Sequence, residues 1–202
     1  MAKTKNKAVF LDRDGVINPL VYNIETKEYE SPNFPEDFSI YPFVLKSLQT
    51  LKKAGFKIFV VSNQPSAAKG KTSIANIKAV EKLLETFSVE NNNLIDGFYY
   101  CHHHPEAVIL KYRKICGCRK PKTLFPKRAV KKYNLNIKRC FFVGDQDSDI
   151  ECGRAMGFYT VKIKNKHSAN KSLKVKADSE AANLYAAVLK ITGGLRCKLN
   201  NT

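Results

Sequence analysis

The stretch that most constrains this chain is AVFLDRDGV, at residues 8–16. Four apolar residues lead directly into two carboxylates, Asp12 and Asp14, which are separated by a single residue. A short, apolar, partly β-branched run is typical of a buried strand in a parallel sheet. Alternation along the strand points Asp12 and Asp14 the same way, and Gly15 lets the chain turn out of the sheet. We therefore expect two carboxylates at the carboxyl end of a buried strand, where open α/β sheets place their functional groups.

The rest of the chain alternates between strand and helix patterns, which predicts a Rossmann-like α/β fold with a doubly wound parallel sheet. Further strands are predicted at 57–61, 96–100, 140–143 and 158–163, and helices at 43–55, 74–90, 122–133, 149–156 and 180–191. Ser179 is the expected cap of the last helix.

The segment at residues 19–42 is too long for a simple connection. Its prolines and aromatic residues predict a β-hairpin flap that packs over the end of the first strand. We expect a single domain over residues 1–202, with a core at about 7–192, a basic tail at 193–202 and no large cap domain.

The net charge is +17, from 35 Lys and Arg against 18 Asp and Glu. Such a balance favours an anionic partner: a phosphorylated metabolite, nucleic acid or an anionic surface. The lysines are spread along the chain without a basic block, which favours a solvated surface over a nucleic-acid face.

No apolar run approaches the ~20 residues of a membrane span, and no signal-peptide pattern is present. We expect a cytoplasmic monomer with no membrane partner.

The predicted strand ends carry the candidate chemistry. Asp12 and Asp14 end the first strand, Ser62 and Asn63 the second, and Asp145 the fourth, so they should meet at one edge of the sheet. The three aspartates offer the hard oxygen ligands that Mg²⁺ prefers. A serine hydroxyl with backbone N–H groups, and Lys120 before the next helix, would hold a phosphoryl group. With no P-loop in the sequence, a carboxylate nucleophile that forms an aspartyl-phosphate remains.

A second cluster combines cysteine and histidine. It reads Cys101-His102-His103-His104, followed by Cys116-Gly117-Cys118. This spacing can close a tetrahedral, structural Zn²⁺ site, although chemistry alone does not choose among the three histidines. The alternative is a loop of free thiols that binds no metal. Cys140, Cys152 and Cys197 are expected to be ordinary thiols.

Four segments together resemble the motifs of the haloacid dehalogenase (HAD) superfamily: FLDRDGVIN at 10–18, VSNQ at 61–64, CRKP at 118–121, and VGD at 143–145 with Asp149. The resemblance is to the branch that holds D-glycero-D-manno-heptose 1,7-bisphosphate phosphatase and histidinol-phosphate phosphatase. It covers about residues 7–192.

This resemblance implies roles for individual residues. Asp12 would be the nucleophile and a Mg²⁺ ligand. Asp14 would be the general acid and base, with its backbone carbonyl on the metal. Asp145 would complete the magnesium shell, with Asp149 behind it. The implied phosphate and substrate contacts are Ser62, Asn63, Gln64, Arg119 and Lys120, and the implied zinc ligands are Cys101, His103, Cys116 and Cys118.

The resemblance also implies a function. The expected reaction is Mg²⁺-dependent hydrolysis of a small phosphorylated sugar, D-glycero-D-manno-heptose 1,7-bisphosphate to the heptose 1-phosphate. Histidinol phosphate is the alternative substrate. A nucleic-acid 3′-phosphatase, suggested by the charge, and an inactive structural relative are further alternatives. Gln146 replaces the lysine that the heptose enzymes usually carry after the fourth motif's aspartate, which bears on substrate recognition.

Overall fold

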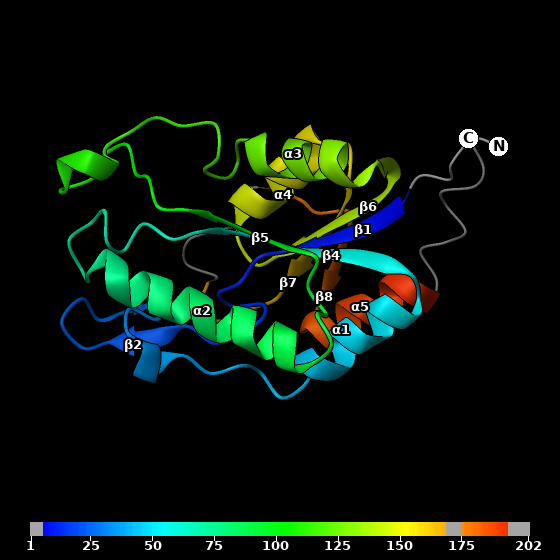
Figure 1. Cartoon of the computed structure of the whole chain (residues 1–202), viewed down its shortest axis with the longest axis horizontal. Helices are drawn as coiled ribbons and strands as arrows, with labels where there is room; N and C mark the ends of the chain where they lie inside the picture. The colour runs from blue at the N-terminus through cyan, green and yellow to red at the C-terminus, as the bar shows by residue number, and fades with distance from the viewer. Residues whose placement is uncertain (1–5, 169–174, 194–202) are drawn as a thin grey trace.

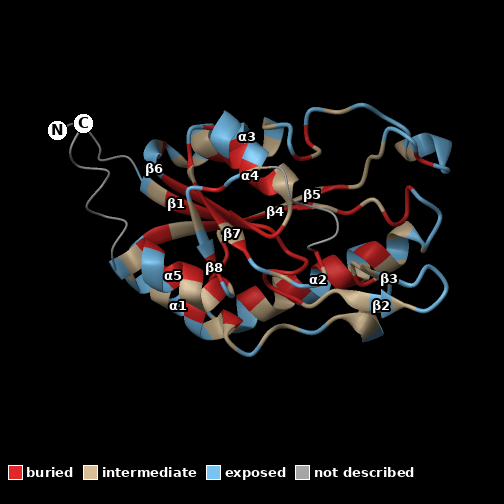
Figure 2. Ribbon diagram, turned by 180° about the vertical axis from the view of Figure 1, so that it is seen from behind, coloured by how far each residue is buried: buried red, intermediate tan, exposed pale blue. Residues whose placement is uncertain are grey.

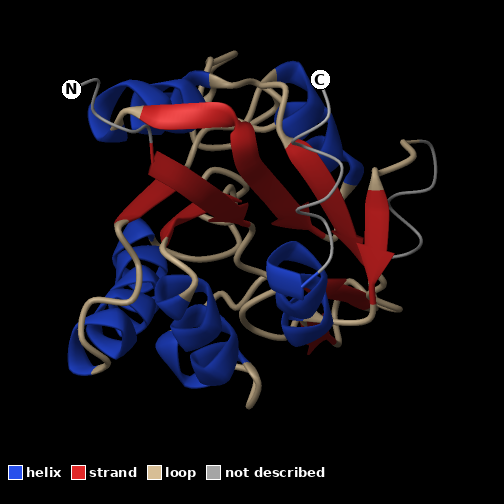
Figure 3. Cartoon of the chain, turned by 90° about the vertical axis from the view of Figure 1, so that its right-hand side faces the viewer, coloured by secondary structure: helices blue, strands red, loops and turns tan. Residues whose placement is uncertain are grey.

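A computed structural model describes residues 6–168 and 175–193. Its six-stranded sheet has the order β5-β4-β1-β6-β7-β8, and every neighbouring pair is parallel. The strands are β1 (Asn6–Leu11), β4 (Phe56–Asn63), β5 (Gly97–Cys101), β6 (Leu135–Gly144), β7 (Tyr159–Ile163) and β8 (Ser179–Ala181). Figure 3 shows this sheet between two layers of helices. The predicted doubly wound α/β sheet is therefore confirmed.

The helices divide between the two faces of the sheet (Figure 1). One face carries α1 (Val44–Lys53), α2 (Ile74–Glu90) and α5 (Leu184–Gly193), and the other carries α3 (Leu124–Tyr133) and α4 (Asp147–Ala155). Alternation along β1 supplies both cores, since Val9 and Leu11 join one cluster and Ala8 and Phe10 the other. The central strands are consequently buried on both faces (Figure 2).

The predicted flap is present after β1. Strands β2 (Val21–Asn23) and β3 (Glu28–Glu30) pair antiparallel as a separate hairpin, followed by the 3₁₀ turn η1 (Pro35–Asp37). A second 3₁₀ turn, η2 (Leu110–Tyr112), lies in the loop that carries the cysteines. Across the described ranges, no helix is both long and apolar enough to cross a membrane.

The prediction of a last helix from residue 180 is wrong at its start. Ser179–Ala181 instead forms β8, which extends the sheet by pairing with β7. The helix begins at Leu184, and its cap is Asn183, whose Oδ1 accepts a 2.9 Å hydrogen bond from the Ala186 N–H. Apart from Gly193, the last residue of α5, the predicted basic tail lies outside the described residues.

Candidate active site

The ends of the three central strands bring the predicted residues together. Asp12 follows β1, Ser62 lies near the end of β4, and Asp145 follows β6. Because β1 pairs with both β4 and β6 in parallel, the three carboxyl ends meet at one edge. The Asp12 N–H donates to the Val143 carbonyl at 2.9 Å, which continues the β1–β6 pairing to the site itself.

Three carboxylates crowd together at this edge. Ligand oxygens of Asp12, Asp145 and Asp149 all lie within 4.8 Å of one another. Burial, followed by the charges of Asp12 and Asp149, raises the pKa of Asp145 well above its usual value. Burial and the Asp12 charge likewise raise the pKa of Asp149, to about 7. The family resemblance implied a position for Asp149 behind the other carboxylates, whereas the structure groups it with Asp12 and Asp145.

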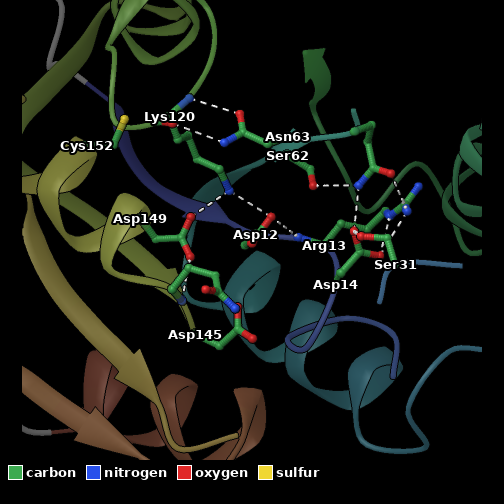
Figure 4. Close-up of polar contacts among 12 residues, drawn as sticks. Asp12, Arg13, Asp14, Ser31, Ser62, Asn63, Lys120, Asp145, Asp149 and Cys152 are labelled. Atoms are coloured by element: carbon green, nitrogen blue, oxygen red, sulfur yellow. Dashed lines mark hydrogen bonds and ion pairs between the residues drawn. The ribbon is translucent and has the colours of Figure 1, made fainter. Parts of the chain in front are cut away.

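Lys120 supplies positive charge to this cluster (Figure 4). Its Nζ lies 2.8 Å from Asp12 Oδ1 and 2.6 Å from Asp149 Oδ1, and the whole side chain is buried. Burial alone would lower the lysine pKa, but the charges of Asp12 and Asp149 outweigh it and raise that pKa. One ammonium group thus faces three carboxylates.

The carboxylate cluster fits a divalent cation. Asp145 Oδ1 is buried and has no hydrogen-bond partner among the described residues, while Oδ2 of the same carboxylate accepts from the Ser168 hydroxyl. A buried anionic oxygen without a donor is costly unless a cation reaches it. Carboxylate oxygens are the ligands that Mg²⁺ prefers. The cluster can therefore hold Mg²⁺ or a similar hard cation.

Two glycines allow the chain to fold this tightly around the carboxylates. A Cβ added to Gly15 would overlap Oδ2 of Asp145, and a Cβ on Gly144 would overlap Asp149. Gly15 also has a φ of +81°, a conformation that other residues rarely adopt.

Asp14 faces a different set of partners. Its Oδ1 accepts hydrogen bonds from Arg13 and Asn18, and its Oδ2 from Ser31 at 2.8 Å and Gln64 at 2.6 Å. Burial raises the pKa of Asp14, but the Arg13 guanidinium and the three other donors outweigh it and leave that pKa below its usual value. Asp14 is accordingly an ionised carboxylate whose two oxygens both accept hydrogen bonds.

Asn63 and Gln64 support their neighbours. The Asn63 side chain bonds the backbone of Lys120 twice, with Nδ2 donating to the carbonyl at 3.1 Å and Oδ1 accepting from the N–H at 2.9 Å. The Gln64 amide N–H donates to Ser62 Oγ at 2.9 Å as well as to Asp14. Asn63 thereby fixes the segment that carries Lys120, and Gln64 lies behind the site.

These side chains open into a cavity of about 240 Å³. Asp12, Asp14, Ser62 and Lys120 line this cavity, together with Asn63. The remaining lining residues are Leu20, Tyr29, Glu30, Ser31, Pro65, Arg119, Gln146, Ser148 and His167. Arg119 and Gln146 thus face the same space as Asp12 and Asp14, whereas Gln64 is absent from the lining.

The cysteine and histidine cluster assembles beside this cavity. The sulfur atoms of Cys101, Cys116 and Cys118 lie 3.2 to 3.6 Å apart, and His103 Nδ1 lies 3.5 Å from Cys118 Sγ. Zn–S bonds of about 2.3 Å in a tetrahedral site hold sulfur pairs at a similar separation, a little under 4 Å. The described cysteines are free thiols. The four side chains can therefore hold one metal ion.

The fold distinguishes the three histidines that chemistry alone left equivalent. His102 Nε2 lies 2.6 Å from Glu81 Oε1 on α2, and His104 Nδ1 accepts from the Glu106 N–H. His103 alone joins the sulfur cluster. Arg119 follows this cluster directly, and its Nη1 lies 3.4 Å from the His103 carbonyl oxygen.

Sequence reasoning missed three residues of the site. Arg13 is fully buried and links Asp14 to Gln64, Ser31 reaches Asp14 from the flap, and Ser168 reaches Asp145 from the β7–β8 loop. Arg13 could have been suspected from its place between the two aspartates. The two serines lie in loops, where nothing in the sequence pattern marks their partners.

The comparisons with known proteins agree with this geometry. The HAD-hydrolase-like family model matches residues 117–187. The D-glycero-β-D-manno-heptose-1,7-bisphosphate 7-phosphatase of Helicobacter pylori is 32% identical over 80% of this chain and 82% of its own length. The chain belongs to this heptose-bisphosphate phosphatase family of the HAD superfamily. The corresponding α-anomer enzyme of Photorhabdus laumondii is also 32% identical, over 78% of this chain and 81% of its own.

Solved structures of the HAD phosphatases share the fold. The D,D-heptose 1,7-bisphosphate phosphatase of B. bronchiseptica, complexed with magnesium and phosphate, superimposes with a TM-score of 0.72 and 21% identity. That match covers 92% of this chain and 97% of the other. A six-stranded parallel sheet with a hairpin after β1 is accordingly the HAD phosphatase fold, as the sequence predicted.

Replacing Gly15 by alanine tests how closely the backbone approaches Asp145. Gly70→Ala is the matched control, because Gly70 also has a positive φ, +72°, but no atom lies within 4 Å of an added Cβ. The free energy of unfolding of the control should fall only by the conformational cost of a positive φ, about 1 to 2 kcal/mol. In urea unfolding, Gly15→Ala should lower the free energy of unfolding at least twice as much, because its Cβ also displaces the Asp145 carboxylate. Equal losses in the two variants would show that the backbone does not constrain Asp145.

Proposed function

We propose that this chain is a Mg²⁺-dependent phosphatase that hydrolyses D-glycero-D-manno-heptose 1,7-bisphosphate to the heptose 1-phosphate. The main support is the site itself: Lys120 joins Asp12 to Asp149 beside Asp145, whose Oδ1 has no hydrogen-bond partner in the part of the chain that the structure describes. The names of relatives that align over about four-fifths of the chain support the substrate.

The proposed magnesium ligands are the Asp12 and Asp145 carboxylates and the backbone carbonyl of Asp14. Asp149 holds Lys120 against Asp12 and adds to the negative charge that attracts the cation. The bound ion would neutralise the phosphate oxygens and the carboxylates so that two anions can approach each other. The B. bronchiseptica phosphatase, which shares this fold, was crystallised in complex with both magnesium and phosphate, and this is consistent with the assignment.

In the first proposed step, a carboxylate oxygen of Asp12 attacks phosphorus. Asp12 Oδ1 accepts a hydrogen bond from the Arg13 backbone N–H and forms an ion pair with Lys120. We therefore assign the attack to Oδ2. The new bond joins Oδ2 to phosphorus, and the bond from phosphorus to the sugar oxygen breaks. The sugar oxygen leaves with a proton from Asp14. Ser62 and Lys120 hold the phosphoryl oxygens as the charge is redistributed.

In the second step, a water oxygen attacks the aspartyl-phosphate and releases Asp12. Asp14 takes the proton from this water and so recovers the one it gave. The network around Asp14 suits this second role, because its donors keep the carboxylate ionised. For the first role, the substrate phosphate supplies a nearby like charge, which raises the carboxyl pKa.

We further propose that Cys101, His103, Cys116 and Cys118 hold a structural Zn²⁺ ion. A site with four protein ligands has no open position for catalysis. Its effect is to fix the loop that leads directly into Arg119 and Lys120, while Asn63 fixes the same segment from β4. Arg119 is then presented to the part of the substrate beyond the reacting phosphate.

The substrate assignment can be tested by phosphate release with Mg²⁺ from three compounds: heptose 1,7-bisphosphate, histidinol phosphate and a 3′-phosphorylated DNA. The proposal expects the highest kcat/KM for the heptose. Both anomers need testing, because the relatives' names differ in the anomer. Preferential hydrolysis of histidinol phosphate would assign the chain to the alternative activity, and preferential release from DNA would overturn a small-molecule substrate.

Asp12→Asn should lower kcat by about 10³-fold or more, because the amide is a poor nucleophile and the covalent step is lost. Asp37→Asn, on η1 and outside the cavity lining, is the control and should retain activity. Mass spectrometry of quenched wild-type enzyme should also find phosphate on Asp12. Substantial Mg²⁺-dependent turnover by Asp12→Asn would contradict the nucleophile assignment.

Cys116→Ser should abolish zinc binding, because it removes one of four ligands. Cys140→Ser is the matched control, since Cys140 is a buried thiol outside the cluster. Metal analysis after dialysis should find about one zinc ion per chain in the wild type and in the control, and none in Cys116→Ser. A wild-type protein that retains no zinc after expression in zinc-containing medium would rule out the structural ion.

A further inference from the structure

The proposed chemistry uses only some of the residues that line the cavity. Beyond the phosphate-holding groups, the lining includes Leu20, Tyr29, Pro65 and His167. None of these residues has a role in the two chemical steps. Because they form the wall that the rest of a substrate would meet, they bear on which substrate is accepted.

Tyr29 and His167 form an aromatic pair in this wall. Their ring centroids lie 3.6 Å apart with an interplanar angle of 29°, which is a stacked arrangement. Tyr29 lies on β3 of the flap, and His167 lies in the loop after β7. The pair therefore joins two segments from distant parts of the sequence in the wall of the cavity.

A serine that closely follows each ring in the sequence donates a hydrogen bond to a carboxylate of the site. Next to Tyr29, Glu30 pairs with Lys71, and Ser31 donates to Asp14. On the other side of the pair, the His167 N–H donates to Asn165, and the Ser168 hydroxyl donates to Asp145. The position of the pair is consequently linked through its neighbours to Asp14 and Asp145.

The geometry points to a binding subsite in which the Tyr29–His167 pair, together with Leu20, contacts the carbon skeleton of the substrate. A sugar ring presents C–H groups on its faces and hydroxyl groups at its edge. Aromatic and aliphatic side chains suit such a face, and polar groups around it orient the hydroxyls. This subsite rests on the proposed function, and it names the class of organic group accepted: the face of a ring-form sugar.

His167→Ala and His167→Phe distinguish a substrate-binding subsite from a contact that only holds the flap in place. The alanine variant removes the ring, whereas phenylalanine keeps the stack and the apolar face. Lys166→Ala is the neighbouring control, because Lys166 is exposed and does not line this cavity. The substrate is whichever ring-form phosphosugar the wild-type enzyme hydrolyses with the highest kcat/KM. The inhibition constant of inorganic phosphate is measured in parallel to report on the phosphate-holding groups.

We expect His167→Ala to raise KM for the phosphosugar about 3- to 10-fold, the equivalent of one aromatic contact. The inhibition constant of phosphate should change much less, and His167→Phe and Lys166→Ala should stay near the wild-type KM. Equal changes in the phosphosugar KM and the phosphate inhibition constant would overturn the subsite, because the residue would then act through Asp145. An unchanged KM in His167→Ala would also overturn it. Failure of the proposed function is distinguishable, because it is read from the wild-type enzyme alone: heptose 1,7-bisphosphate would then not be its preferred substrate, whatever the His167 variants do.

Discussion

Repulsion among three buried carboxylates is the constraint on which this structure depends. Asp12, Asp145 and Asp149 lie within one ligand sphere, and Lys120 alone brings a side-chain positive charge into contact with them among the described residues. Neutralising one of three buried negative charges leaves a large electrostatic cost. A divalent cation bound among these carboxylates would remove that cost, so the charge imbalance itself favours a metal ion at this edge of the sheet.

The sheet explains why this arrangement can be held so closely. The three central strands end at one edge, and they are buried on both faces by separate apolar cores. Glycine at positions 15 and 144 lets backbone pass where a side chain would overlap a carboxylate. The flap and the cysteine loop are then added around a rigid edge. The flap reaches Asp14 through Ser31, and the cysteine loop leads directly to Lys120.

Much of this arrangement could be predicted from the sequence, because strand ends in a parallel sheet must meet. The apolar run before Asp12 and the runs before Ser62 and Asp145 were sufficient to bring those residues together. The short strand β8 was missed, since its three residues, Ser-Glu-Ala, contain no apolar run and pair only at the edge of the sheet. Ser31 and Ser168 are single hydroxyls in loops, and only the fold shows their partners. The choice of His103 likewise depends on how the loop turns after β5.

The metal site is tested most directly by anomalous diffraction from crystals grown with Mn²⁺, a substitute for Mg²⁺ with a strong anomalous signal, and inorganic phosphate. We expect a manganese peak within about 2.2 Å of carboxylate oxygens of both Asp12 and Asp145. We also expect a phosphate in contact with Lys120 and Ser62. A manganese ion bound elsewhere, or a phosphate out of reach of Lys120 while the three carboxylates remain together, would contradict this assignment.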